Sequence, residues 1–172
     1  MRPSTQSVTL VLAAFPFQIN AVMPAGVGAG STGLQVSSAV GTASQNVTIA
    51  GAAPGIFAIG TAANGEPLGA VVNQDGTVST ALNPSQRGQY ISIYGTGLGA
   101  TVAQGGLQVA TTPVTVVLNG TVLKPSYAGM TPGIAGLYQV NGLVPAGTTP
   151  GVGTIAAQAG GETSNTVAVV LQ

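Results

Sequence analysis

The side chains able to carry out acid–base or metal chemistry are few in this sequence. The chain holds three carboxylates, Glu66, Asp75 and Glu162, and it has neither histidine nor cysteine. General acid–base catalysis near neutral pH usually relies on histidine or on paired carboxylates, and these three residues are far apart along the chain. Serine and threonine are abundant, but none has a visible base to activate its hydroxyl. We therefore expect no catalytic residue, no cofactor and no enzymatic activity.

One short segment, Asn73-Gln-Asp75-Gly76, has a weak likeness to the start of a calcium-binding loop. The acidic residue that closes such a loop is missing here. Asn, Asp and Gly are also the residues that tight turns prefer. We interpret the segment as a hairpin turn and predict no metal site.

Two segments fit the pattern for N-glycosylation, Asn46-Val-Thr48 and Asn119-Gly-Thr121. Asn119 begins an Asn-Gly pair, which is a strong signal for a two-residue hairpin turn and would make the side chain accessible. Chance is the simpler explanation in a Thr-rich chain. Asn46 and Asn119 remain the candidate glycosylation sites.

The low charge of the chain limits its partners. Only six of 172 residues are charged, three of them basic, and the net charge is zero. Three basic residues neutralise too few phosphates for nucleic-acid binding, and no run of 18 apolar residues predicts a membrane-spanning helix. Charge repulsion normally keeps copies of a protein apart. We expect the surface to be covered by copies of itself or kept soluble by glycan.

The chain repeats itself. Residues 17–26 match residues 138–147, and residues 44–49 match residues 164–169 with a one-residue slip. Such internal similarity indicates two copies of one structural unit.

The first copy is shorter than the second. Residues 8–12 look like residues 114–118, but they begin 10 residues before Gln18, whereas 114–118 begin 25 before Gln139. The first copy lacks the counterpart of about 119–134 and of everything upstream. We therefore predict a truncated first unit and a complete second one.

The repeated motif centres on Phe17, Gln18 and Asn20 in the first copy. Its counterparts are Tyr138, Gln139 and Asn141. Side chains alternate between the two faces of a strand, so both amides of a copy share one face. A ligand site is one interpretation. We favour a structural role, in which the amides bond to backbone near the prolines that follow.

The pattern predicts an all-β fold. Many short segments rich in Val, Ile, Leu and Thr are bounded by turn residues, and no window has a sustained helical period. These segments are 7–13, 17–23, 33–38, 44–50, 68–73, 89–94, 114–118, 121–127, 136–144, 152–158 and 164–171. Regularly spaced strands of this kind indicate an immunoglobulin-like β-sandwich.

We divide the chain into three parts. Residues 1–51 form the truncated β unit, 52–83 a connector with a hairpin, and 84–172 the complete immunoglobulin-like sandwich. A single merged, jelly-roll-like sandwich is the alternative architecture.

The sequence also resembles a known domain type. Residues 84–99, Pro-Ser-Gln-Arg-Gly-Gln-Tyr-Ile-Ser-Ile-Tyr-Gly-Thr-Gly-Leu-Gly, look like the opening strand of IPT/TIG-type immunoglobulin-like modules. From about residue 17 onward, the chain resembles an uncharacterised C-terminal domain of large secreted proteins of Acidobacteria. The matching pieces are Phe17-Gln-Ile-Asn20, Ala53-Pro-Gly-Ile-Phe57, Asn73-Gln-Asp-Gly76, Ile93-Tyr-Gly-Thr-Gly-Leu-Gly99, Tyr127-Ala-Gly129 and Tyr138-Gln-Val-Asn141. The resemblance implies an all-β fold and secretion, but no known activity or catalytic residues.

The truncated unit suggests assembly. Strand edges are usually protected by charge, especially lysine, and this chain has one lysine. A neighbour's extended segment can fill such an open edge by β-strand addition. The segment from about residue 4 to residue 13 suits this donor role, because Val8, Leu10 and Leu12 lie on one apolar face. Pairing within its own subunit is the alternative, and a signal segment or a disordered tail is a third.

We therefore predict a structural subunit of an extracellular filament, a homopolymer joined by its N-terminal strand. Head-to-tail donation does not close on itself, so it builds an open chain. The alternative function is a secreted module that binds carbohydrate or a cell surface. The absence of Trp counts against that alternative, because sugar sites usually present aromatic platforms.

Overall fold

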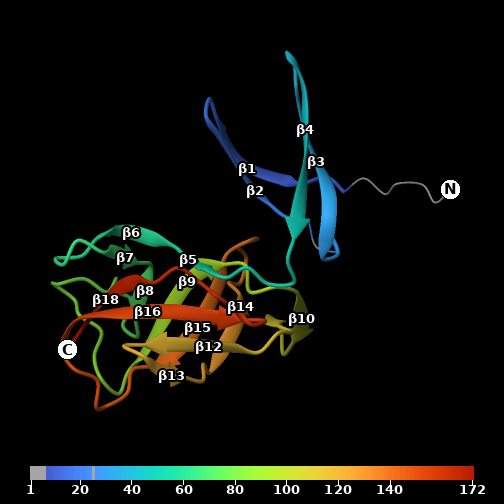
Figure 1. Cartoon of the computed structure of the whole chain (residues 1–172). Coiled ribbons are helices and arrows are strands. Elements are labelled where there is room, and N and C mark those ends of the chain that lie inside the picture. Colours follow the sequence, from blue (N-terminus) through green and yellow to red (C-terminus); the bar gives the residue numbers. More distant parts are fainter. Residues whose placement is uncertain (1–6, 25) are drawn as a thin grey trace. The chain divides into compact units, whose positions relative to one another are not determined.

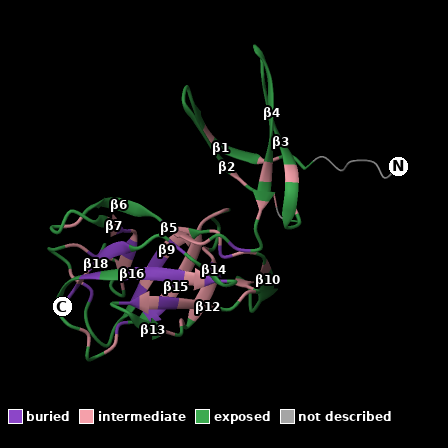
Figure 2. Ribbon diagram, viewed as in Figure 1, coloured by how far each residue is buried: buried purple, intermediate pink, exposed green. Residues whose placement is uncertain are grey.

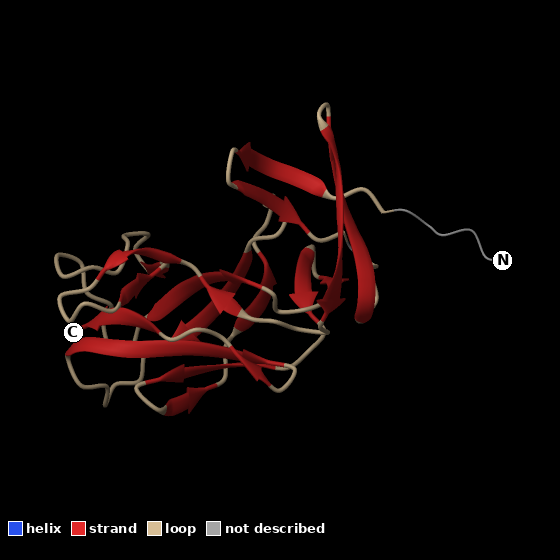
Figure 3. Ribbon diagram, turned by 45° about the horizontal axis from the view of Figure 1, so that its top comes forward, coloured by secondary structure: helices blue, strands red, loops and turns tan. Residues whose placement is uncertain are grey.

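Every regular element among the described residues is a β-strand. A computed structural model describes residues 7–24 and 26–172, and this part of the chain contains 18 strands and no helix (Figure 3). None of the described segments is therefore a helix able to cross a membrane. The all-β prediction is confirmed. The chain divides into two compact units, Met1–Gly51 and Ala52–Gln172, which we call the N-terminal and C-terminal units.

The C-terminal unit is a β-sandwich made of two seven-stranded sheets (Figure 1). In spatial order, the first sheet contains β10 (Thr101–Gln104), β11 (Leu107–Ala110), β14 (Tyr127–Met130), β15 (Tyr138–Leu143), β9 (Tyr90–Thr96) and β5 (Gly55–Ile56), and β8 (Val71–Asn73) also pairs with β9. The second contains β13 (Thr121–Leu123), β12 (Val114–Leu118), β16 (Gly151–Ala159), β18 (Val167–Leu171), β7 (Pro67–Gly69) and β6 (Ala58–Thr61), and β17 (Glu162–Thr163) pairs with β16.

The core lies between these two sheets. Ile91 and Ile93 of β9 point inward from the first sheet, and Ile155, Val167 and Val169 point inward from the second. Figure 2 shows the buried residues gathered in this unit. Full burial of such a side chain contributes about 1.5–3 kcal/mol. The alternation of buried and exposed residues along β9 is what the sequence pattern predicts.

Residues 52–83 are part of the sandwich rather than a connector. They supply β5 and β8 to the first sheet and β6 and β7 to the second. Asn165 fixes the start of this segment, because its side chain accepts a hydrogen bond from Ile56 N at 2.8 Å and donates one to Ile56 O at 3.0 Å. Strands of two to four residues are too short to show an alternating pattern, so the sequence gives no signal for β5 and β6. The single strand expected over 68–73 is two short strands, β7 and β8, which belong to different sheets.

Two predicted turns are present. Asn119 and Gly120 have φ of 47° and 80° and join β12 to β13, as expected for a hairpin turn that needs positive φ. Asn73 to Gly76 also form a turn, in which Gly76 N donates to Asn73 O at 2.9 Å. The Asp75 carboxylate caps this turn by accepting hydrogen bonds from the hydroxyl and backbone N–H of Thr77, which lower its pKa.

The N-terminal unit consists of two separate hairpins. β1 (Leu10–Phe15) pairs with β2 (Gln18–Val22), and β3 (Gly30–Ser38) pairs with β4 (Gly41–Ile49), each in antiparallel register. A β-bulge interrupts β1 between Val11 and Ala13. None of the described residues in this unit is buried, as Figure 2 shows. The unit therefore lacks a hydrophobic core of its own in the described residues.

Candidate assembly site

The two hairpins of the N-terminal unit have counterparts in the sandwich. The Gln-x-Asn strand β2 pairs with β1, the strand just before it, and the Gln-x-Asn strand β15 pairs in the same antiparallel way with β14. β1 thus occupies the position of β14. The sequence likeness of residues 8–12 to β12 is misleading, because β12 pairs with β13 and β16 in the other sheet. Both segments are simply runs of Val, Leu and Thr.

The second hairpin corresponds to the other sheet. β3 pairs with β4 so that Thr32 lies opposite Val47, and β16 pairs with β18 so that Ile155 lies opposite Val167. The N-terminal unit therefore contains one counterpart pair from each sheet of the sandwich.

Several neighbouring strands lack a counterpart in the N-terminal unit. In the sandwich, β15 also pairs with β9, β16 with β12, and β18 with β7. No strand among residues 7–24 and 26–172 pairs with the corresponding edges of β2, β3 and β4. Each of these edges presents a row of backbone N–H and C=O groups that can pair with another strand.

Equivalent apolar residues differ sharply in burial between the two units. Val140 on β15 is 4% exposed, whereas its counterpart Ile19 on β2 is 48% exposed. Phe17, the counterpart of the half-buried Tyr138, is 99% exposed. Among the described residues, 11 of the 22 exposed large hydrophobic side chains lie in the N-terminal unit. These strands carry core-type residues without a core.

The repeated amides form one polar cluster per unit. Gln139 Nε2 donates to Asn141 Oδ1 at 2.8 Å and to Ser92 Oγ at 3.3 Å, and Ser92 Oγ donates to Asn141 Oδ1 at 3.0 Å. In the N-terminal unit, Gln18 Nε2 donates to Asn20 Oδ1 at 2.6 Å. The expected bonds from these amides to backbone near the prolines are not formed, because the amides bond to each other and, in the sandwich, to a hydroxyl.

Two of the three predicted donor residues, Leu10 and Leu12, lie in β1. Val8 precedes the strand and is 92% exposed, Leu10 lies opposite Val22, and Leu12 sits at the bulge. This is the self-paired arrangement that the sequence left open. Residues 4–6 of the donor segment lie outside the described residues. Insertion into a neighbouring copy stays a prediction.

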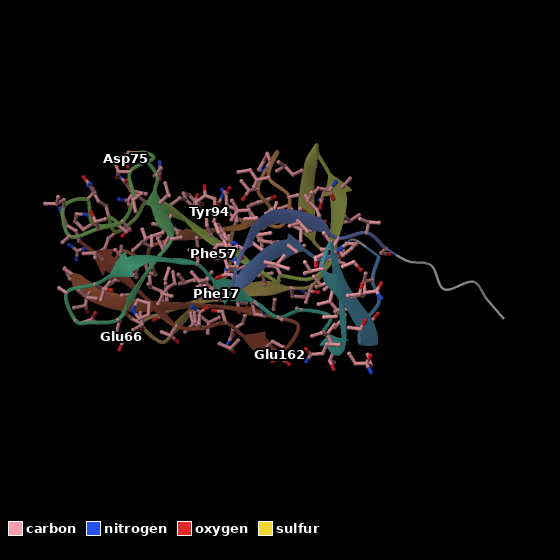
Figure 4. The ribbon with its side chains drawn as sticks, turned by 90° about the horizontal axis from the view of Figure 1, so that it is seen from above. Phe17, Phe57, Glu66, Asp75, Tyr94 and Glu162 are labelled. Atoms are coloured by element: carbon pink, nitrogen blue, oxygen red, sulfur yellow. The ribbon has the colours of Figure 1, made fainter. Side chains whose placement is uncertain are left out.

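A second surface was not found from the sequence. Tyr90, Ser92 and Tyr94 alternate with the buried residues of β9 and therefore lie on the outer face of the first sheet. Tyr127 lies on the same face, with its hydroxyl over Gly129 and donating to Met130 O at 2.7 Å. Partial burial raises the pKa of the Tyr127 phenol. Figure 4 shows Tyr94 among the side chains. Pairing β9 with β15 was needed to see this cluster.

Tyr138 has a structural role instead. It points toward the inner side of the first sheet, where its hydroxyl donates to Gly99 O at 2.6 Å. Burial raises the pKa of this phenol. Its counterpart Phe17 has no hydroxyl, so this link is absent from the N-terminal motif.

The titratable and glycosylation candidates lie apart. Figure 4 shows Glu66, Asp75 and Glu162 at separate places, and the described residues contain no group of three or more His, Cys, Asp or Glu side chains that could hold a metal ion. Asn119 lies at its hairpin tip, but its Oδ1 accepts a hydrogen bond from Thr154 N at 2.8 Å. Asn46 lies on β4 and is exposed.

No protein-family profile matches this chain, and none of the curated proteins matches it either.

Proposed function

We propose that this chain is a structural subunit of an extracellular filament and joins copies of itself by β-strand addition at its N-terminal unit. The observation that carries this proposal is the contrast in burial between equivalent strands. β2 and β15 share a sequence motif, yet Val140 is buried and Ile19 is exposed. A strand that belongs in a sandwich needs the covering strands that the sandwich provides.

The low stability expected of isolated hairpins supports the addition of strands from another molecule to the N-terminal unit. An isolated two-stranded hairpin is at best marginally stable in water, and the N-terminal unit consists of two of them. Each Val, Leu or Ile side chain that becomes fully buried contributes about 1.5–3 kcal/mol. Main-chain hydrogen bonds to an added strand provide further stabilisation and set its register.

The weakly charged surface supports association between identical chains. Lys124 is the only lysine, and it follows β13 in the C-terminal unit. The sequence of the N-terminal unit has Arg2 as its single charged residue. Charged side chains that normally oppose edge-to-edge pairing are therefore nearly absent from the strands that need them.

The resemblance to secreted Acidobacteria domains supports an extracellular location and an immunoglobulin-like topology for the C-terminal unit. On this proposal the N-terminal unit is a truncated copy of that fold. Filaments outside a cell also need no catalytic residues, in keeping with a chain without histidine and cysteine.

Electron microscopy and size-exclusion chromatography test the proposal. We expect the purified chain to form filaments or large oligomers. A matched variant that contains only residues 52–172 should elute as a monomer, because it keeps the core and loses the open hairpins. A monomeric full chain at high concentration would refute the proposal.

The outer face of the first sheet favours a second function, binding of a neutral polysaccharide. Tyr90 and Tyr94 flank a cluster of hydroxyl and amide groups, and aromatic faces and amides are the groups that recognise sugars. Affinity electrophoresis in gels with neutral polysaccharides checks this function. Retardation that is lost in Tyr90→Ala and kept in Val122→Ala, an exposed control on β13, would support it.

A further inference from the structure

We propose that the open edge of β2 is an acceptor site for residues 7–11 of a second copy, in the antiparallel register that β9 has on β15. This inference rests on the assembly proposed above and names the two segments that meet. The sandwich supplies the template, because β15 and β2 carry the same motif.

The pairing of β9 with β15 indicates which sequence a strand added to β2 should have. On β15, Val140 faces Ile93, Asn141 faces Ser92 and Gly142 faces Ile91. The Ser92 hydroxyl joins the amide pair through bonds of 3.0 and 3.3 Å. The occupant is therefore an antiparallel strand with a hydroxyl residue between two aliphatic ones.

The acceptor edge has the matching groups. Ile19, Asn20 and Ala21 on β2 correspond to Val140, Asn141 and Gly142. Gln18 and Asn20 already form the amide pair at 2.6 Å. A hydroxyl opposite Asn20 would complete the three-residue cluster of the sandwich.

The described chain contains few segments of this type. Four combine Val, Ile or Leu on both sides of Ser or Thr, and they are 8–10, 47–49, 91–93 and 114–116. The last three lie inside β4, β9 and β12, whereas Val8 and Thr9 lie before β1 begins. Val8 is also 92% exposed. Residues 8–10 are therefore the segment best placed to add to another chain.

The register of the donor segment on β2 follows from the register of β9 on β15. With Thr9 opposite Asn20, Leu10 faces Ile19 and Val8 faces Ala21. The apolar side chains of the donor then lie on the face that β9 uses for Ile91 and Ile93. The exposed face of Ile19 becomes covered by the same kind of neighbour as Val140.

Few β1–β2 pairs within the donor chain are lost when its residues 7–11 add to another copy. A bulge separates Val11 from Ala13, so Leu10 and Val11 form a short end of β1 that pairs only with Val22 and Ala21. A β-bulge bends a strand and locally ends regular pairing. Release of this end leaves the three pairs from Ala13 to Phe15 in place.

Donor and acceptor are different segments, so each chain gives one strand and receives one. Such a head-to-tail contact does not close a dimer by itself and propagates into a filament. The neutral edge adds no repulsion, because neither segment contains a charged residue.

Engineered cysteines test the pairing, since the chain has none of its own. Thr9→Cys and Asn20→Cys chains are mixed, assembled and oxidised. Within one chain Asn20 lies opposite Ala13, four residues from Thr9. That spacing is roughly 13 Å along a strand, beyond disulfide reach. We expect a disulfide-linked dimer that contains one chain of each variant.

A matched control and a second variant keep the test decisive. Ser37→Cys on β3 replaces Asn20→Cys in a parallel mixture and should yield several-fold less cross-link. Asn20→Leu should reduce filament yield several-fold, whereas Asn46→Leu, on the exposed hairpin strand β4, should not. Filaments without the Thr9–Asn20 cross-link would overturn this inference and leave the assembly proposal standing. Absence of assembly in the unmodified chain would overturn both.

Discussion

The side chain of Gln139 donates a hydrogen bond to Asn141 at 2.8 Å, and this bond recurs between Gln18 and Asn20 at 2.6 Å. Residues two apart on a strand share one face, so the pair forms from local geometry in either unit. The two units differ in the strand that adjoins this amide pair. Only the sandwich pair contacts the Ser92 hydroxyl of an adjoining strand. The motif is therefore complete in one unit and open in the other.

This contrast predicts unequal effects of the same mutation. Asn141→Ala removes the acceptor of both Gln139 and Ser92 and should lower the free energy of unfolding of the C-terminal unit by about 1–3 kcal/mol. Asn20→Ala should leave that unfolding transition unchanged, because none of the described residues of its unit is buried. Urea denaturation followed by tyrosine fluorescence measures both. Equal effects would contradict a role for the Ser92 contact.

A second prediction concerns Gly97 in the Gly-Thr-Gly-Leu-Gly segment. Its φ is +76°, and a Cβ there would collide with the carbonyl oxygen of Ala53. Gly97 O also accepts a hydrogen bond from Ala53 N at 2.8 Å. Gly97→Ala should destabilise the C-terminal unit by at least about 1–3 kcal/mol. Gly147→Ala, which meets no atom within 4 Å and is not at positive φ, is the control in the same urea titration.

Much of the fold was predictable because alternation is a local property of long strands. β9 and β15 show inward aliphatic and outward polar residues, and Asn119-Gly120 marks its hairpin without tertiary information. The short strands β5 and β6 have no such signal, and β7 and β8 fall within one predicted strand, 68–73, although they belong to different sheets. Contacts with distant residues hold these strands, such as the hydrogen bond between Ile56 and the Asn165 side chain. No local sequence pattern predicts a partner 109 residues away.

The candidate site was only half predictable for a related reason. The repeat revealed Gln18 and Asn20, but the third member of the cluster, Ser92, lies on a strand 49 residues from Asn141. The upstream likeness of residues 8–12 to β12 was wrong because similar composition does not specify sheet position. Strand order, which the structure supplies, showed that β1 matches β14.

A third prediction follows from the Asn165 contacts. Asn165→Ala removes both side-chain bonds to the Ile56 backbone, and it should release the start of the C-terminal unit from the sandwich. The expected loss is roughly 1–3 kcal/mol, at about 0.5–1.5 kcal/mol for each bond. Hydrogen exchange should speed up at the Ile56 amide while the Ile93 amide stays protected. Thr166→Ala, an exposed neighbour, is the control.

A fourth prediction concerns acid. Hydrogen bonds from the Thr77 hydroxyl and amide hold the pKa of Asp75 below its ordinary value of 3.8. A group whose folded pKa is lowered stabilises the protein above its unfolded pKa, and this stabilisation is lost as pH falls through the folded pKa. Asp75→Asn should therefore lower stability at pH 7 more than at pH 2. Thermal melts of both proteins at the two pH values test this prediction. An equal loss of stability at pH 7 and pH 2 would contradict the link between the Asp75 pKa and stability.

The last prediction concerns the force that joins the subunits. Only six side chains are charged, and none lies on the proposed acceptor or donor segments. Raising sodium chloride from about 0.01 M to about 1 M shortens the screening length from about 30 Å to about 3 Å. Assembly held by hydrophobic burial and main-chain bonds should persist across this range, whereas sulfate should promote it because it strengthens apolar burial. Light scattering at constant protein concentration gives the readout. Dissolution of the filaments by sodium chloride alone would mean that charges hold them together, against the edge pairing argued above.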